Sequence, residues 1–249
     1  MDPEVYARMA LIEGEHWWFS ARRQILKEVL SRKINLPAEA KLLEVGCGTG
    51  GNLALLSQFG NVCALEPDPE ARRLASLKSG IEVREGSLPR SVPFEDASFD
   101  LIAMLDVLEH LEDDVGSLNA LGAKLRPGGS ILLTVPAFPF LWSRHDETHH
   151  HKRRYRRDDL LRAIAAAGLV PTMITYINSF LFPAIAGVRL AKKLLDVDGP
   201  DDDGLPPPLL NRVLRAIFAC ETPFVGRTGL PVGVSLLAVA RPDISSPVN

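Results

Sequence analysis

Residues 41–51 read Lys-Leu-Leu-Glu-Val-Gly-Cys-Gly-Thr-Gly-Gly, a short apolar strand that runs into a glycine-rich turn. Glycines let the backbone turn tightly and approach a ligand closely, because they carry no Cβ atom. Gly46, Gly48 and Gly51 satisfy the G-x-G-x-x-G pattern of dinucleotide binders, although that pattern is weak on its own. Glu44, at the lip of the turn, would repel a pyrophosphate and would attract a cationic ligand that lacks phosphate.

The charge of Glu44 therefore bears on the class of cofactor. A nicotinamide or flavin dinucleotide places its pyrophosphate over such a turn. S-adenosylmethionine carries an ammonium group, a sulfonium and an adenosine but no phosphate, so the sequence favours it. Glu66 ends the apolar run 62–66, about 20 residues past the first glycine, where a carboxylate accepts both ribose hydroxyls. Both cofactor classes need that acid, so an NAD-dependent oxidoreductase stays the alternative.

The composition is that of an ordinary globular protein. Of 249 residues, 46% are hydrophobic and 24% charged, and the formal net charge of −3 gives no general attraction to nucleic acid. The three cysteines form no C-x-x-C pair, which indicates a reducing compartment and no structural zinc. Residues 1–20 contain acids and no apolar signal-peptide core. We expect a cytoplasmic protein.

Short β-rich runs alternate with helical stretches beyond the first turn, which requires a mostly parallel sheet with helices on both faces. After 62–66, the predicted strands are 81–84, 99–105, 130–135, 169–176 and 235–240. The predicted helices are 69–78, 115–125 and 157–167. We expect the second helix to stop at a turn over 126–129 and the third to be capped by Gly168.

Two segments fall outside this alternation, namely the first 35 residues and an insertion over 177–233. The insertion holds an apolar helix candidate from Phe180 to Leu195, an acidic loop over 196–203 and a second helix candidate over 209–220. Its uninterrupted apolar run is too short to cross a bilayer. Two interpretations stay open: an in-plane helix at a membrane surface, or a lid packed on the active site.

Four stretches in the expected order resemble the motifs of class I S-adenosylmethionine-dependent methyltransferases: 44–50, 93–102, 105–111 and 125–133. The resemblance is close over residues 40–135 and looser beyond. It implies an α/β fold with a Rossmann-like, seven-stranded, mostly parallel sheet and helices on both faces. It also implies a single domain over 1–249, with N-terminal lid helices (1–35), a cofactor-binding core (40–176), the helical insertion (177–233) and a last strand (234–241).

The resemblance also implies roles for the residues around the cofactor. The three glycines would lie against the methionine and ribose, Glu44 would attract the ammonium group, and Glu66 would hold the ribose hydroxyls. Arg22 is the candidate partner of the methionine carboxylate. The full expected set for S-adenosylmethionine is Arg22, Glu44, Gly46, Gly48, Gly50, Glu66, Pro67, Ser87, Leu88, Leu105 and Asp106.

Beyond residue 135 the sequence resembles a bacterial subgroup linked to cell-surface polysaccharide or lipid-linked precursors. Aromatic residues near the N-terminus, a basic loop and the insertion carry this resemblance. The basic loop could clamp a phosphate, a carboxylate or an anionic headgroup. The expected acceptor-binding residues are Trp17, Trp18, His150, Arg153, Arg154, Tyr155 and Phe180.

Methyl transfer from a sulfonium is an in-line displacement that needs a base only when the nucleophile is protonated. The candidate bases are His110, His145 and His149, and we expect no bound metal. The strand end at 105–108 lacks the Asp/Asn-Pro-Pro-aromatic signature of nucleobase methyltransferases, which argues against nucleic acid. We expect a methyltransferase acting on a small or lipid-linked acceptor, at oxygen, in the cytoplasm or at the inner membrane face. A non-catalytic membrane-surface scaffold is the other alternative.

Overall fold

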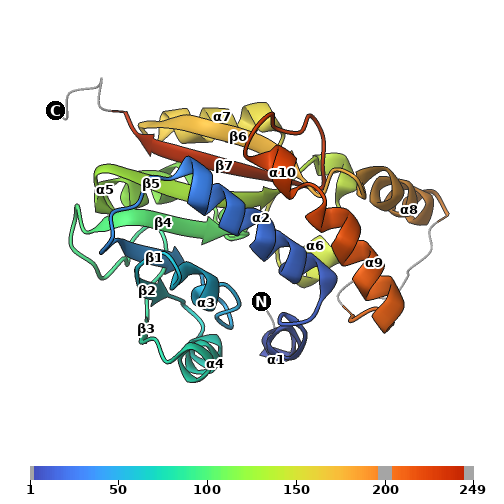
Figure 1. Cartoon of the computed structure of the whole chain (residues 1–249), viewed down its shortest axis with the longest axis horizontal. Helices are drawn as coiled ribbons and strands as arrows, with labels where there is room; N and C mark the ends of the chain where they lie inside the picture. Colours follow the sequence, from blue (N-terminus) through green and yellow to red (C-terminus); the bar gives the residue numbers. More distant parts are fainter. Residues whose placement is uncertain (1–2, 196–203, 244–249) are drawn as a thin grey trace.

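The computed structural model describes residues 3–195 and 204–243 (Figure 1). Its strands are β1 (Lys41–Val45), β2 (Asn61–Leu65), β3 (Val83–Arg84), β4 (Phe99–Leu105), β5 (Leu125–Pro136), β6 (Leu169–Ile177) and β7 (Ser235–Pro242). Its α-helices are α1 (Pro3–Ile12), α2 (Trp17–Lys33), α3 (Leu53–Leu56), α4 (Pro69–Ser79), α5 (Asp114–Lys124), α6 (Arg144–Thr148), α7 (Arg157–Ala166), α8 (Phe182–Leu194), α9 (Pro208–Ala219) and α10 (Thr222–Val225). Two short 3-10 helices are η1 (Leu108–His110) and η2 (Pro139–Leu141).

The seven strands form one sheet in the order β3-β2-β1-β4-β5-β7-β6. Neighbouring strands from β3 to β5 pair in parallel, and β7 runs antiparallel to both of its neighbours. The order reverses between β1 and β4, and in open α/β sheets ligands bind beyond the carboxyl ends of the strands at such a point. The predicted seven-stranded, mostly parallel sheet is confirmed.

Both faces of the sheet are buried. Alternate residues of β1 and β4 point to opposite sides, so Leu43 and Ile102 pack against α5 and α7 while Leu42 and Leu101 pack against α2 and α9. This burial explains why the strands read as continuous apolar runs. Figure 1 shows α2 lying across the sheet, with α8 and α9 at one end of the molecule.

The predicted helices form with the expected ends. In α4, Asp68 caps the first turn by accepting hydrogen bonds from the backbone N–H groups of Glu70 and Ala71, and Gly80 closes the helix in the left-handed conformation. Helix α7 likewise ends just before Gly168, whose φ is +74°.

One predicted boundary is wrong. Residues 126–129 do not form a turn between helix and strand, because β5 already begins at Leu125, next to the end of α5. Phe99 pairs with Leu125, and the register then shifts so that Leu101 pairs with Ser130. Gly128, with φ of +83°, lets the strand absorb the extra residues as a bulge.

The insertion forms α8 and α9, close to the two predicted helices, whereas its predicted acidic loop lies outside the described residues. Helix α9 packs on α2 through the fully buried Phe218, which is worth about 1.5–3 kcal/mol as buried apolar surface. No helix within 3–195 or 204–243 combines the length and the apolar character needed to cross a membrane.

Candidate functional site

The glycine-rich loop follows β1 at the edge of the sheet where the strand order reverses. Gly46, Gly48 and Gly50 all have positive φ, at +65°, +53° and +82°. A Cβ atom on Gly46 would lie 2.6 Å from the Val107 side chain, and one on Gly50 would lie 3.1 Å from the Ala75 backbone. Residues with side chains would therefore strain the loop and fill the space beside it.

Two buried carboxylates border this loop. Glu66 accepts hydrogen bonds from the backbone N–H groups of Gly48, at 2.9 Å, and of Asp68, at 3.1 Å. Glu44 accepts one from the Asn52 amide at 2.9 Å, and its second oxygen has no hydrogen-bond partner within the described chain. Burial raises the pKa of Glu44 to about 7, because the ionised form loses its water shell.

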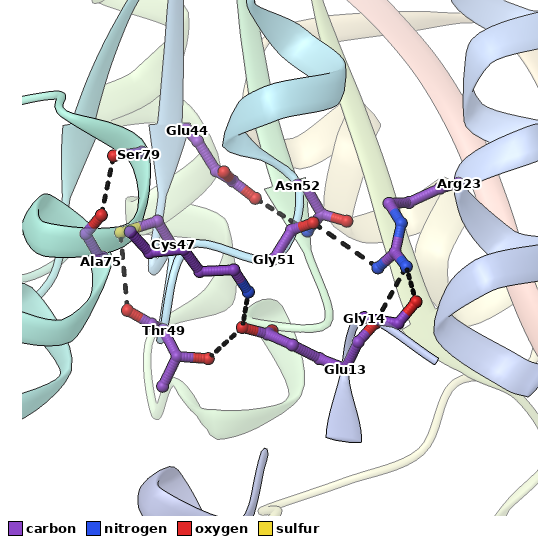
Figure 2. A network of polar contacts seen from close by, with 12 residues as sticks. Glu13, Gly14, Arg23, Glu44, Cys47, Thr49, Gly51, Asn52, Ala75 and Ser79 are labelled. Carbon is purple, nitrogen blue, oxygen red and sulfur yellow. Dashed lines mark hydrogen bonds and ion pairs between the residues drawn. The ribbon is translucent and has the colours of Figure 1, made fainter. Parts of the chain in front are cut away.

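The N-terminal segment covers the loop (Figure 2). The buried carboxylate of Glu13 accepts hydrogen bonds from the Thr49 hydroxyl at 2.7 Å and from the Lys78 ammonium at 2.5 Å. Arg23, from α2, donates to the Glu13 and Gly14 carbonyl oxygens at 2.8 and 3.2 Å. Segments before β1 thus form one wall of the site.

A partly buried ion pair lies directly after β4. Asp106, in the left-handed conformation with φ of +57°, is paired with Arg22 of α2. The guanidinium also stacks on the Trp18 ring, with 4.4 Å between its Cζ and the ring centroid. Burial lowers the pKa of Arg22 to about 10, which leaves it charged at neutral pH. The structure therefore brings Arg22, Trp18 and Asp106 together.

The next residues along the chain form a titratable cluster. Glu109 and His110 lie on η1, directly after β4, and His151 joins them from the loop after α6, with 4.0 Å between its Nε2 and a Glu109 oxygen. His151 Nδ1 lies 2.9 Å from Asp146, whose carboxylate also accepts a hydrogen bond from Arg154 at 2.7 Å. Desolvation lowers the pKa of His110 to about 3 and raises that of Glu109 to about 8.

The predicted basic loop is mostly occupied by internal contacts. Arg154 is buried against Asp146 and the Ala137 carbonyl oxygen, so its guanidinium does not reach solvent. Tyr155 is also buried, and its hydroxyl donates to Asp114 at 2.9 Å. Arg153 is partly exposed and pairs with the same Asp114 at 3.0 Å.

The rings of His145 in α6 and of His149, directly after that helix, lie 4.2 Å apart between centroids at a tilt of 34°, and each lies about 6 Å from the His151 ring. His150 is exposed beside them, with φ of +56°. These rings form a histidine cluster, and His110 extends it, with 4.7 Å between its ring centroid and that of His151.

Other predicted residues are dispersed. Trp17 packs edge-on against Phe218, 6.1 Å away, and Phe180 packs near Phe224 at 6.2 Å, so neither contacts the histidine cluster. Leu105 is buried at the end of β4, and Leu88 packs on the core. Pro67 and Ser87 are exposed, beside Glu66 and in the loop after β3 respectively.

Sequence reasoning missed Glu109 and Asp146 as site residues. The first directly precedes the candidate base His110 and follows β4, so its position at the strand end was a usable signal. Asp146 gave no such signal, because only the folded loop brings it to His151.

Comparison with known proteins identifies the family. Residues 16–173 match the family described as "Methyltransferase domain". The chain belongs to this methyltransferase family. The match decides against the dehydrogenase alternative and confirms the resemblance found in the sequence, so the enzyme uses S-adenosylmethionine as its methyl donor. The glycine cradle and the open oxygen of the buried Glu44 fit a cationic, phosphate-free ligand.

Two bacterial relatives are both named "Ubiquinone biosynthesis O-methyltransferase". The protein of Methylocella silvestris is 29% identical over 212 residues, covering 68% of this chain and 82% of the relative. That of Idiomarina loihiensis is 29% identical over 224 residues, covering 80% and 91%.

Solved structures share the fold. A methyltransferase of Haloferax volcanii in complex with the Trm112 activator superposes with a TM-score of 0.61 at 20% identity, covering 96% of this chain and 94% of the other. Geranyl diphosphate methyltransferase in complex with S-adenosylmethionine gives 0.58 at 17% identity, covering 90% and 85%.

Proposed function

We propose that this methyltransferase transfers the methyl group to a hydroxyl oxygen of a small organic acceptor that has an apolar body. The observation that carries the proposal is the cluster of Glu109, His110 and His151 directly after β4, next to Asp106. A hydroxyl is a poor nucleophile while it keeps its proton, so an oxygen acceptor needs such groups. The O-methyltransferase names of the relatives agree with this chemistry.

We assign the methyl donor to the glycine loop and its two acids. Glu66 would hold the ribose hydroxyls, Glu44 the ammonium group, and the Arg22–Asp106 pair would lie beside the methionine portion. When bound, the donor supplies an electrophilic methyl group on a sulfonium. The chain aligns the acceptor oxygen with that group and excludes water through α2 and the N-terminal segment.

On the acceptor side, His151 is the proton-handling residue supported best. Asp146 stays ionised, because contacts from His151 and Arg154 hold the pKa of its carboxyl well below its usual range. The hydrogen bond to Asp146 then places the imidazole proton on Nδ1 and leaves Nε2 with a lone pair facing Glu109. His145 and His149 remain further candidate bases, because their rings lie against each other near His151.

We expect methylated products to carry O–CH3 groups. The test incubates the enzyme with S-adenosylmethionine labelled with 13C in its methyl group and a panel of phenols, catechols, amines and sugars, each with and without an alkyl tail. Carbon-13 chemical shifts distinguish O-, N- and C-methyl products. Transfer to a tailed hydroxyl compound supports the proposal, and transfer only to nitrogen or carbon contradicts it.

We further propose that α8 and α9 contact an anionic membrane surface, where a lipid-linked acceptor resides, and that the chain is otherwise cytoplasmic. Leu194 of α8 is 85% exposed and Leu209 of α9 is 69% exposed, both unusual for large apolar side chains. Exposed Lys193, Arg212 and Arg215 lie on the same two helices. Apolar and basic side chains together are typical of interfacial helices.

The double variant Leu194→Asp, Leu209→Asp should lose co-sedimentation with vesicles that contain 30% phosphatidylglycerol, whereas the wild type sediments. The matched control is Leu77→Asp, because Leu77 is 72% exposed on the distant helix α4. If the wild type stays in the supernatant at every lipid composition, the lid interpretation of the insertion replaces this one.

A further inference from the structure

The carboxyl group of Glu109 is the buried acid in the site that the described residues leave without a hydrogen-bond partner. Its side chain is fully buried, and among the described residues neither oxygen accepts a hydrogen bond from another residue. The nearest guanidinium groups are already engaged, since Arg22 pairs with Asp106 and Arg154 with Asp146. A carboxylate in such a position is costly unless a cation or a proton joins it.

Two imidazoles face the same space. One ligand atom each from Glu109, His110 and His151 lies within 4.8 Å of the others, and the Glu109–His151 pair is at 4.0 Å. Ligands bound to zinc at 2.0–2.1 Å in a tetrahedron lie about 3.3 Å apart, so side-chain shifts of about 1 Å would close the set.

Both imidazoles are held by outer partners. Nδ1 of His151 is bonded to Asp146, which in turn is fixed by Arg154 and by the backbone N–H of Ser143. The ring of His110 is hydrogen-bonded to the backbone of His150. Metal-binding histidines characteristically donate their second nitrogen to a carboxylate or a carbonyl oxygen in this way, which fixes the tautomer and orients the lone pair.

We propose that Glu109, His110 and His151 form a binding site for a divalent transition-metal ion, with zinc as the best-matched ion. Two imidazoles and one carboxylate suit such an ion, and they leave at least one coordination position open. The sequence predicted no bound metal, because it offers no cysteine and no spaced pair of acids to complete a site with the histidines. The folded chain supplies a mixed set of ligands instead.

The role of this ion rests on the proposed O-methylation. With the ion bound, His151 Nε2 would be a ligand, so the ion would replace His151 as the group that helps the acceptor lose its proton. The acceptor hydroxyl would occupy the open position, where the ion lowers its pKa as it does for bound water, and the proton would leave to solvent. The oxygen lone pair then forms the new bond to the methyl carbon. The carbon–sulfur bond breaks with its electron pair kept by sulfur, which gives S-adenosylhomocysteine and the neutral methyl ether.

The test measures metal binding without any acceptor. Protein freed of metal by a chelator is titrated with Zn2+ in a calorimeter. We expect one ion per chain, at least 100-fold weaker binding for Glu109→Gln and for His151→Ala, and about 10–100-fold weaker binding for Asp146→Asn, which only orients a ligand. Glu112→Gln is the matched control, because that carboxylate is exposed and pairs with Lys152 at the surface.

Circular dichroism and the Zn2+-induced rise in melting temperature show which variants still fold, and His110→Ala provides an independent ligand variant. The absence of stoichiometric binding, or equal binding by wild type and Glu109→Gln, would overturn the site. Failure of the two proposals looks different. If the protein binds Zn2+ but methylates only nitrogen, the metal site stands and the proposed function fails. If metal-free protein shows full O-methylation, the proposed function stands and the proposed role of the ion fails.

Discussion

Replacing Arg154 by alanine is expected to lower the free energy of unfolding by about 3–5 kcal/mol, because it leaves the fully buried Asp146 carboxylate without its cationic partner. In a chain of this size, such a loss corresponds to a decrease in melting temperature of about 6–20 °C. Differential scanning calorimetry at neutral pH measures it directly.

The neighbouring Arg153→Ala is the matched control. Arg153 is about one-third exposed, and exposed ion pairs are worth at most about 1 kcal/mol, so the melting temperature should change little. Its removal should instead raise the KM for an anionic acceptor, if that residue binds one. Equal melting temperatures for the two variants would contradict the structural distinction between these adjacent arginines.

The affinity for S-adenosylhomocysteine should fall as the pH falls below 7. The pKa of Glu44 in the free protein is raised to about 7, and the ligand's ammonium group would favour the ionised carboxylate. Below that pH the carboxyl must first lose a proton, so binding weakens toward tenfold per pH unit, or about 20–30-fold between pH 7.5 and 5.5. The ammonium group keeps its charge over this range, so it adds little to the slope.

Calorimetric titrations at several pH values test this expectation, with Glu44→Gln as the decisive variant. The glutamine should bind more weakly at pH 7.5 and should lose most of the pH dependence. Glu70→Gln serves as the control, because Glu70 is an exposed acid paired with Arg73 on α4. A slope that persists in Glu44→Gln would assign the titration to another group.

The sequence predicted the sheet well because its signals are local. Apolar runs bounded by turn residues reveal strands such as β1 and β4, and a helix start such as Asp68-Pro69 lies within a few residues of the helix it caps. The start of β5 was misplaced for the same reason, since Arg126-Pro127-Gly128-Gly129 is typical of a turn and only pairing with β4 turns it into a bulged strand.

Candidate site residues could be predicted from the sequence where a single motif contains them. They could not be predicted where segments distant in the sequence come together. The glycines, Glu44 and Glu66 follow strands whose ends must gather at one edge of the sheet. Arg154 and Tyr155, by contrast, belong to a polar run that looks exposed in the sequence. Their partners Asp146 and Asp114 come from other elements, and these contacts bury two residues that were expected to bind the acceptor.

Glu13 limits where a truncated version of this protein can begin. The segment shared with the family begins at residue 16, so a domain trimmed to that boundary would lack Glu13. Thr49 in the glycine loop and Lys78 in α4 would then lose the buried acid that joins them, and Tyr6, which hydrogen-bonds to Glu66, would go as well. Part of the wall around the glycine-rich loop is thus encoded ahead of the segment that matches the family.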